Sequence, residues 1–228
     1  MKLRPLVQLI LWTFDFLFRL FARARFYGLE NLPQRGPYLM IVNHLSYADA
    51  PLVAIGVRSP YMVALAADTY QKNLLFRWLV ETVGGVWISR GSGDRGAIKA
   101  AVDTLKSGKI LGIAPEGTRS KVTHALMKAK SGAAFIASKA GVPVLPVAVT
   151  GTQNIWRDLR RFRRAEVTLT VGPTFTLPPL VGEDKNKQLE EHTHEMMCRL
   201  AALLPEEYQG VYRGDVRMKE IAGAKHSP

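Results

Sequence analysis

The sequence predicts one α/β domain, with a mostly parallel or mixed central sheet flanked by helices and an apolar helix in front of it. Short apolar runs alternate along the chain with segments whose apolar residues recur at helical spacing, which is typical of α/β folds. The chain has 228 residues, of which 47% are hydrophobic, and this suits a single globular domain with a sizeable core.

Residues 1–24 are expected to form an apolar helix that lies on a membrane surface. Their polar residues are spaced by seven and four, so they fall on one narrow helical stripe: Gln8, Asp15, Arg19 and Arg23. The uninterrupted apolar part is shorter than the ~20 residues that a membrane span needs. Apolar and aromatic residues between basic ends favour an interfacial helix.

Two other interpretations of residues 1–24 remain open. The helix could cover the core of the domain, which is compatible with membrane contact. It could also be a signal peptide, since Ala22-Arg23-Ala24 resembles a cleavage site, although Asp15 and Arg19 do not suit the apolar region of such a peptide.

The elements of the domain follow in order over residues 25–212, and a polar tail, expected to be loose, occupies residues 213–228. Apolar runs bounded by turn residues predict strands at 25–30, 38–42, 61–66, 85–90, 110–114, 142–149 and 167–171. Helical spacing predicts helices from Ser46 and over 74–83, 98–105, 133–140 and 189–204.

The strand at 38–42 ends abruptly at Asn43-His44, and Asp49 follows five residues after the histidine. Histidine titrates near neutrality, and a carboxylate can fix its tautomer and stabilise the imidazolium, so this pair is a candidate general base with its supporting acid. The spacing of Ser46 and Asp49 is also that of a capping box, so Asp49 could merely cap the next helix.

Three predicted strands end in polar clusters: Asn43-His44, Ser89-Arg90 and the segment 115–119. Ligands bind at the carboxyl ends of strands in α/β sheets, so these clusters should meet if the strands are parallel. Guanidinium groups offer planar, bidentate donors for phosphate. Taken singly, the arginines would be ordinary surface residues; their recurrence at strand ends favours a site.

These motifs resemble those of the glycerolipid acyltransferases. His44-Leu45-Ser46-Tyr47-Ala48-Asp49 matches the H-x4-D motif, and Pro115-Glu116-Gly117-Thr118-Arg119-Ser120 matches the third block of that family. Residues 85–90 and 142–147 resemble the second and fourth blocks, and 28–33 are also typical. The resemblance covers residues 25–175 and is strongest to bacterial-type 1-acyl-sn-glycerol-3-phosphate acyltransferases.

The resemblance implies an acyl transfer without an acyl-enzyme. His44 would take the proton of the free hydroxyl of a lysophospholipid, Asp49 would orient His44, and the hydroxyl oxygen would attack the thioester of acyl-CoA or acyl-carrier protein. Neither a cofactor nor a metal is implied. The expected product is phosphatidic acid.

The resemblance also assigns a substrate-binding set. Arg90 and Arg119 would bind the acceptor phosphate, Glu116 would position Arg119 or the substrate, and Gly117 would allow a close backbone approach. Family members often carry a basic residue near Lys128 and Lys130. The full predicted set is Arg90, Glu116, Gly117, Thr118, Arg119 and Lys130. Many members also carry a lysine in the strand equivalent to 61–66; its absence here leaves the acceptor head group open.

Charge and cysteine content limit the partners. The net charge of +12 implies an anionic partner, and we expect an anionic membrane surface rather than nucleic acid. Cys198 is the single cysteine, so no internal disulfide can form, and a reducing compartment is expected. These expectations together place the protein on the cytoplasmic face of a membrane.

Three other patterns suggest rival functions. Residues 91–96 read G-x-G-x-x-G, with Glu116 twenty residues beyond, as in dinucleotide-binding proteins. The basic run 157–164 could bind nucleic acid, anionic head groups or a carrier protein, or be a solvated loop. His192 and His194 suggest a metal site, but without further ligands nearby in sequence we interpret them as surface residues.

Overall fold

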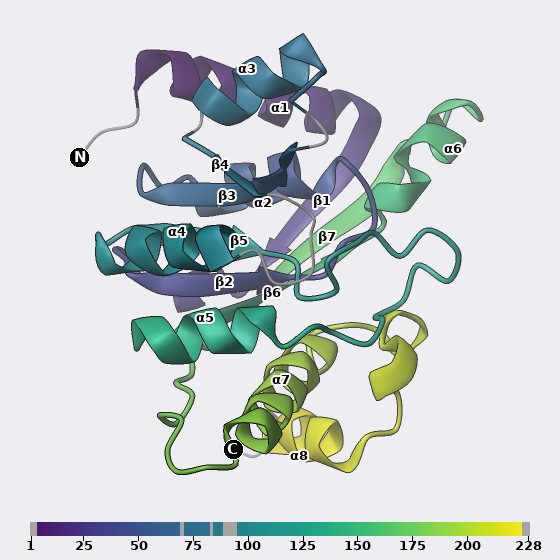
Figure 1. Ribbon diagram of the computed structural model, residues 1–228. Helices are drawn as coiled ribbons and strands as arrows, with labels where there is room; N and C mark the ends of the chain where they lie inside the picture. Colours follow the sequence, from purple (N-terminus) through teal and green to yellow (C-terminus); the bar gives the residue numbers. More distant parts are fainter. Residues whose placement is uncertain (1–3, 69–70, 83, 89–94, 225–228) are drawn as a thin grey trace.

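The protein is built on one seven-stranded sheet, seen in a computed structural model that describes residues 4–68, 71–82, 84–88 and 95–224 (Figure 1). The strands lie in the order β1-β7-β6-β2-β5-β3-β4. Neighbouring strands run parallel except β6 and β7, which are antiparallel, so the sheet is mixed as predicted. The strands are β1 (Ala22–Tyr27), β2 (Tyr38–Val42), β3 (Met62–Ala67), β4 (Val86–Ile88), β5 (Ile110–Ile113), β6 (Val144–Thr150) and β7 (Ala165–Val171).

Strand β2 lies in the middle of the sheet and is buried on both faces. Its odd-numbered residues Leu39 and Ile41 belong to one core cluster, and its even-numbered residues Tyr38 and Met40 belong to the other. This alternation follows from the two-residue period of a strand, and it explains why the whole segment is apolar. The β2 residues end at the centre of the carboxyl edge of the sheet.

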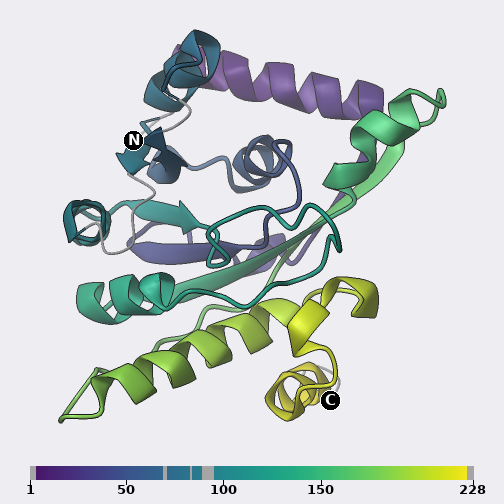
Figure 2. The same ribbon diagram turned by 45° about the vertical axis from the view of Figure 1, so that its right-hand side comes forward.

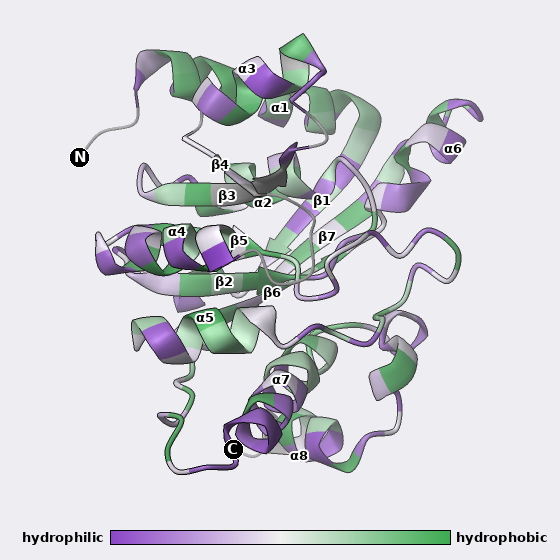
Figure 3. Ribbon diagram, in the orientation of Figure 1, coloured by the Kyte–Doolittle hydropathy of each residue, from purple (hydrophilic) through white to green (hydrophobic). Residues whose placement is uncertain are grey.

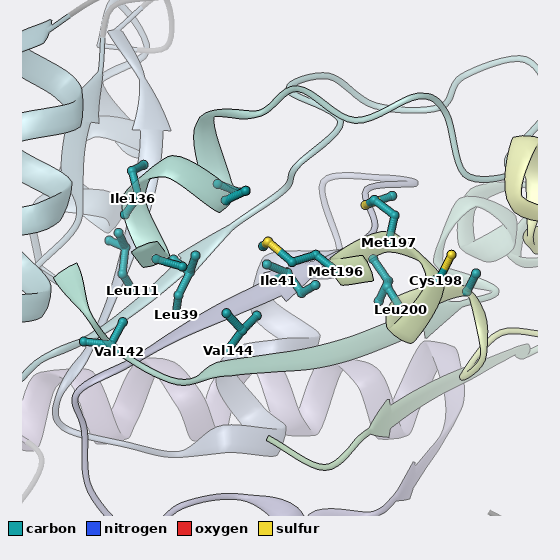
Figure 4. Close-up of a cluster of buried hydrophobic side chains, with 14 of the residues drawn as sticks. Leu39, Ile41, Leu111, Ile136, Val142, Val144, Met196, Met197, Cys198 and Leu200 are labelled. Carbon is teal, nitrogen blue, oxygen red and sulfur yellow. The ribbon is translucent and has the colours of Figure 1, made fainter. Parts of the chain in front are cut away.

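Helices cover both faces of the sheet, which gives three layers (Figures 1 and 2). One face carries α1 (Pro5–Phe21) and α2 (Asp49–Val57), and the other carries α4 (Arg95–Lys106), α5 (Gly132–Ala140) and α7 (Lys185–Ala201). Figure 4 shows the second of these layers, where Met196 and Leu200 of α7 lie over Ile41 and Val144 of the sheet. Two shorter helices, α3 (Leu74–Thr82) and α6 (Ile155–Leu159), lie toward the α1 side, and α8 (Val216–Ala224) follows α7.

The predicted N-terminal helix is present as α1, with Pro5 at its first position, where the missing amide hydrogen costs no hydrogen bond. Leu11 and Phe18 are buried against the domain, so this helix does cover part of the core. Its outer side remains apolar (Figure 3), with these large side chains exposed: Leu6, Leu9, Trp12, Phe16, Leu17 and Leu20. Among the described residues, no helix combines the length and apolar character that crossing a membrane requires.

The predicted bounds of the first strand were wrong. The first strand is β1 at Ala22–Tyr27 rather than 25–30, and Ala22-Arg23-Ala24 therefore lies inside a strand. Arg23 and Arg25 point to the exposed side and pair with Glu166 of β7. An arginine-rich segment can be an edge strand when every second residue faces solvent.

The predicted loose tail was also wrong, because its described part forms α8. Met218 is buried and Ile221, one helical turn later, packs beside the same core cluster. Asp215 accepts a hydrogen bond from the Met218 amide at 3.2 Å at the start of this helix, and Arg217 pairs with Glu195 of α7 at 2.7 Å. The sequence did not predict this helix, because Met218 and Ile221 are two apolar residues in a segment that is otherwise mostly polar.

Candidate active site

His44 and Asp49 form a hydrogen-bonded pair at the end of β2. The Nδ1 atom of His44 lies 2.8 Å from Oδ2 of Asp49. The Asp49 side chain is buried, whereas 30% of the His44 side chain is exposed. Within the described part of the chain, His44 Nε2 has no hydrogen-bond partner, so this nitrogen is available to a substrate. A buried carboxylate thus holds the imidazole while its far nitrogen stays accessible.

Asp49 is fixed by several further donors. Its Oδ2 accepts the backbone amides of Leu45 at 2.7 Å and Ser46 at 2.9 Å. Its Oδ1 accepts a short hydrogen bond from the Thr152 hydroxyl and a longer one, 3.4 Å, from the Ser46 hydroxyl. Asp49 is also the first residue of α2, but the two amides that it accepts belong to Leu45 and Ser46, before the helix, and no side chain in the described part of the chain caps α2.

Thr152 was missed by sequence reasoning. It lies in the 3-10 helix Thr152–Asn154, directly after β6, which is the neighbour of β2 in the sheet. Gly151 makes this turn possible: its φ is +81°, and a Cβ there would lie 1.9 Å from the Glu166 carbonyl oxygen. The available signal was Thr-Gly-Thr at the end of a buried strand, which is recognisable only once β6 is placed beside β2.

Glu116 lies on the other side of His44, after β5, but its role differs from the one predicted. Its Oε1 accepts the His44 amide at 3.1 Å and its Oε2 accepts the Met127 amide at 3.0 Å. Burial raises the pKa of Glu116, and the hydrogen bonds from Met127 and His44 oppose that rise. The carboxylate therefore positions the backbone at His44 rather than Arg119, and it is too enclosed to bind a ribose, as the dinucleotide-binding interpretation requires.

The segment after Glu116 forms a loop that the C-terminal part of the chain supports. The Ser120 amide donates to the His44 carbonyl at 2.9 Å, and the Lys130 amide donates to the Pro115 carbonyl at 3.0 Å. Leu126 exchanges backbone hydrogen bonds with Tyr208 and Val211, at 2.9 and 3.2 Å. These bonds hold both ends and the middle of the loop beside His44.

Two cationic side chains of the predicted set lie along this loop. The Arg119 guanidinium stacks on the ring of Tyr47, 3.8 Å from its centroid, and donates to the Tyr47 hydroxyl at 2.9 Å. The Lys130 side chain runs past Gly117, where its Nζ would lie 3.6 Å from an added Cβ. Gly117 has a φ of +70°, so glycine is favoured here for its backbone as well as for the space.

Two cavities adjoin these residues. An apolar cavity of about 160 Å³ lies beside His44 and Asp49, and it is lined further by Met40, Val42, Asn43, Ala50, Val53, Met62, Val63, Gly112, Ile113 and Ala114. A second cavity of about 620 Å³ lies along the loop, and Thr118, Arg119, Lys121 and Lys128 are among its lining residues. One cavity thus adjoins the histidine–aspartate pair, and the other adjoins the loop that carries Arg119.

The predicted convergence is confirmed for two of the three strand ends. His44 after β2 and Glu116 after β5 are in contact, because these strands are parallel neighbours. Arg90 lies outside the described residues, as does most of the segment 91–96, and its part in the site remains a prediction. Strand β4, which precedes Arg90, is separated from β2 by β5 and β3.

Asn43 anchors the end of β2 and gives a test of how the site is built. It is buried, its Nδ2 donates to the Val149 carbonyl at 2.8 Å, and its Oδ1 accepts the Val149 amide at 2.7 Å. Asn43→Ala should lower the free energy of unfolding by about 2–4 kcal/mol, because two buried backbone groups of β6 lose their partners. Urea unfolding would measure this, with the exposed Asn186→Ala as control; equal midpoints would contradict it.

The histidines of α7 do not behave as a pair. His192 is buried, contrary to prediction, and its Nδ1 lies 3.2 Å from the Ser138 hydroxyl. His194 is half-exposed and bonds to Asp215 at 2.9 Å, with the Cys198 sulfur 3.5 Å away. Burial, followed by the hydrogen bond to Asp215, raises the pKa of Cys198 to about 12, so its thiol stays protonated. His194, Asp215 and Cys198 thus form a hydrogen-bonded cluster that joins α7 to the start of α8.

The fold and the site define an α/β protein with a hydrogen-bonded histidine–aspartate pair at the carboxyl edge of its sheet, beside an apolar cavity. Residues 23–150, more than half of the chain, match the model of the acyltransferase family. The chain belongs to the acyltransferase family.

Individual relatives agree with this assignment. The chain is 27% identical over 155 residues to the 1-acyl-sn-glycerol-3-phosphate acyltransferase of Streptococcus pneumoniae, covering 67% of this chain but only 54% of that enzyme. It is 34% identical over 122 residues to the lyso-ornithine lipid O-acyltransferase of Pseudomonas aeruginosa, covering 51% of this chain and 44% of that enzyme. The crystal structure of the LPA acyltransferase PlsC from Thermotoga maritima superposes with a TM-score of 0.62 at 25% identity, covering 83% of this chain and 75% of that one.

Proposed function

We propose that this protein transfers an acyl chain from an acyl thioester to the free sn-2 hydroxyl of 1-acyl-glycerol-3-phosphate, which gives phosphatidic acid. The observation that carries the proposal is the His44–Asp49 pair, with an accessible Nε2 beside an apolar cavity. The relatives, including the pneumococcal 1-acyl-sn-glycerol-3-phosphate acyltransferase and the LPA acyltransferase of Thermotoga maritima, support this acceptor. Acyl-CoA and acyl-carrier protein are both candidate donors.

In the proposed reaction, His44 Nε2 removes the proton of the acceptor hydroxyl as its oxygen attacks the thioester carbonyl. Asp49 stabilises the imidazolium that forms. The tetrahedral intermediate then collapses, the carbon–sulfur bond breaks, and the imidazolium proton is available to the departing thiolate. The products are an ester and a free thiol, and His44 is neutral again. The apolar cavity lined by Met40, Val53 and Met62 accommodates an apolar part of a substrate beside the reacting atoms.

The experiment is acyl transfer by the purified protein, followed by lipid mass spectrometry. Lysophosphatidic acid, glycerol-3-phosphate, zwitterionic lysolipids and lyso-ornithine lipid are each offered with acyl-CoA and with acyl-carrier protein. Phosphatidic acid formed from lysophosphatidic acid supports the proposal. If product formed only on lyso-ornithine lipid, the reaction would still be an acyl transfer but the acceptor would be this lipid. Lyso-ornithine lipid is the second candidate because one relative is a lyso-ornithine lipid O-acyltransferase. No transfer with any pair would refute the proposal.

Arg119 and Lys130 supply the positive charge for the acceptor phosphate in this proposal. Arg119→Ala should raise KM for lysophosphatidic acid by about tenfold or more, because the substrate phosphate loses charge-assisted hydrogen bonds. Arg119→Lys should recover only part of this effect, since it keeps the charge but loses the planar fork. Initial rates at varied acceptor concentration measure both. Lys139→Ala, at an exposed position of α5 that lines neither cavity, is the control; a KM for Arg119→Ala that matches this control would contradict the assignment.

We also infer that α1 binds the protein to the cytoplasmic face of a membrane. Trp12 and Phe16 are 58% and 63% exposed on its outer side, although they are large apolar side chains. Trp12→Ser with Phe16→Ser should reduce binding to lipid vesicles by about tenfold or more, because interfacial binding scales with the apolar area inserted. Vesicle co-sedimentation measures this, with the exposed Val181→Ser and Val211→Ser as control. Unchanged binding would contradict the inference.

A further inference from the structure

Residues 155–164, here called the basic lip, comprise α6 and the turn that leads into β7. In both ribbon views the lip projects from the edge of the molecule beside the C-terminal end of α1 (Figures 1 and 2). Its two aromatic side chains lie in solvent, with Trp156 73% exposed and Phe162 fully exposed. Neither belongs to a core cluster, so the stability of the domain does not explain them.

Phe162 has an unusual backbone as well as an exposed ring. Its φ is +55°, in the left-handed region that non-glycine residues seldom adopt and that asparagine tolerates better than bulky residues do. The turn is closed by backbone bonds, from the Phe162 amide to the Leu159 carbonyl and from the Arg163 amide to the Asp158 carbonyl. A glycine or asparagine would serve this turn better, so the phenylalanine points to a contact outside the molecule.

The charge of the lip is strongly positive. Residues 157–164 contain five arginines and one aspartate, and every arginine among them is exposed. Asp158 pairs with Arg157 at 3.0 Å. Arg160, Arg161 and Arg163 form no ion pair within the part of the chain that the structure describes. Three guanidinium groups are therefore available to anions from outside.

The lip is joined to the proposed active site and to the proposed membrane helix. At one end, Ile155 follows directly on the 3-10 helix that contains Thr152, whose hydroxyl donates to Asp49. At the other end, the Arg164 guanidinium donates to the backbone carbonyls of Arg19 and Ala22, where α1 ends and β1 begins. The exposed aromatic and basic residues of the lip thus continue the surface of α1.

We propose that the basic lip is a second membrane contact: its free arginines bind the head groups of anionic lipids, and Phe162 and Trp156 enter the interface. This rests on the proposed function, because it assumes an enzyme that works on a lipid surface. Arginine binds phosphate through its planar fork, and amphipathic aromatic rings favour the membrane–water boundary. A carrier protein would match the charges, but a fully exposed phenylalanine two residues from the contact of Arg164 with the end of α1 favours lipid.

The test is co-sedimentation of the full chain with two kinds of vesicle, one of phosphatidylcholine alone and one that also contains about a third of the anionic lipid phosphatidylglycerol, which gives the surface a negative potential. Arg160→Glu with Arg161→Glu should weaken binding to the anionic vesicles by about tenfold or more, at roughly 1 kcal/mol per arginine near the surface. Lys185→Glu with Lys187→Glu on α7 makes the same charge change at an exposed site and should bind like the wild type.

Phe162→Asn tests the aromatic contact without straining the turn. It should weaken binding to both kinds of vesicle about threefold to tenfold, because the loss is apolar rather than electrostatic. Circular dichroism and thermal melting confirm that each variant is folded. Vesicle binding is read without turnover, so this result is independent of whether lysophosphatidic acid is the acceptor.

The proposal would be overturned if the lip variants bound vesicles as well as the Lys185 and Lys187 control does. If those variants also raised KM for acyl-carrier protein and not for acyl-CoA, the lip would instead be a docking site for the carrier. A loss confined to the lip variants supports a lipid contact, even if the acceptor panel assigns another lysolipid.

Discussion

His44→Ala is expected to lower kcat for acyl transfer by about two to four orders of magnitude, the range that a positioned general base contributes. The imidazole is the group that the buried carboxylate of Asp49 orients, and its Nε2 faces the accessible side of the site. Without it, the acceptor hydroxyl keeps its proton as its oxygen approaches the thioester. The rate of thiol release from acyl-CoA, confirmed by phosphatidic acid in mass spectra, measures the loss.

His194→Ala is a suitable control, because His194 is a half-exposed histidine that also pairs with an aspartate, far along the chain on α7. It should keep wild-type kcat. The fold of His44→Ala can be checked by thermal melting, since the alanine leaves the hydrogen bonds of the His44 backbone to Glu116 and Ser120 in place. If a folded His44→Ala variant kept more than a tenth of the activity, His44 would not be the base.

Asp49→Asn should have an effect of similar size, about 10²-fold to 10⁴-fold on kcat, with little change in melting temperature. An asparagine oxygen can still accept the amides of Leu45 and Ser46, and its NH₂ group can donate to the Thr152 hydroxyl, which is able to rotate. The geometry is thus kept, while the negative charge that stabilises the imidazolium is lost.

Thr152→Val adds a graded test of the same assignment. It removes one of the donors to Asp49 but keeps the charge, so a smaller loss of kcat is expected than for Asp49→Asn. Asp15→Asn, which changes an aspartate of α1 that pairs with Arg19 and Arg58, is the charge control. If Asp49→Asn were as active as this control, the carboxylate would only be holding the turn that precedes α2.

The sequence predicts the centre of the sheet well because its signals are local. Strand β2 was predicted with its observed bounds, since the apolar run from Tyr38 to Val42 is closed at once by Asn43 and His44. The contact between His44 and Glu116 followed from one general rule, that parallel strands expose their carboxyl ends at one edge. The features that were predicted correctly were either formed by consecutive residues or common to all parallel sheets.

The parts that were missed depend on contacts between distant segments. The role of Glu116 is set by the backbone amides of His44 and Met127, and the position of a backbone amide cannot be predicted from the side chains in the sequence. Thr152 becomes a neighbour of Asp49 only because β6 pairs with β2. Helix α6 has only five residues, two of them charged, so it is too short to show a helical spacing of apolar residues.

The pairing of β1 with β7 has a consequence for the order of assembly during synthesis. Ala22 pairs with Ala165, so 143 positions separate the first strand from the strand that pairs with it. At typical bacterial and eukaryotic elongation rates, ribosomes need roughly 7 to 30 seconds to add that many residues. Throughout this interval β1 has no partner strand, whereas α1 can already pack on α2, which it contacts in the folded chain. The β1 edge is therefore expected to join the sheet only after β7 has been made.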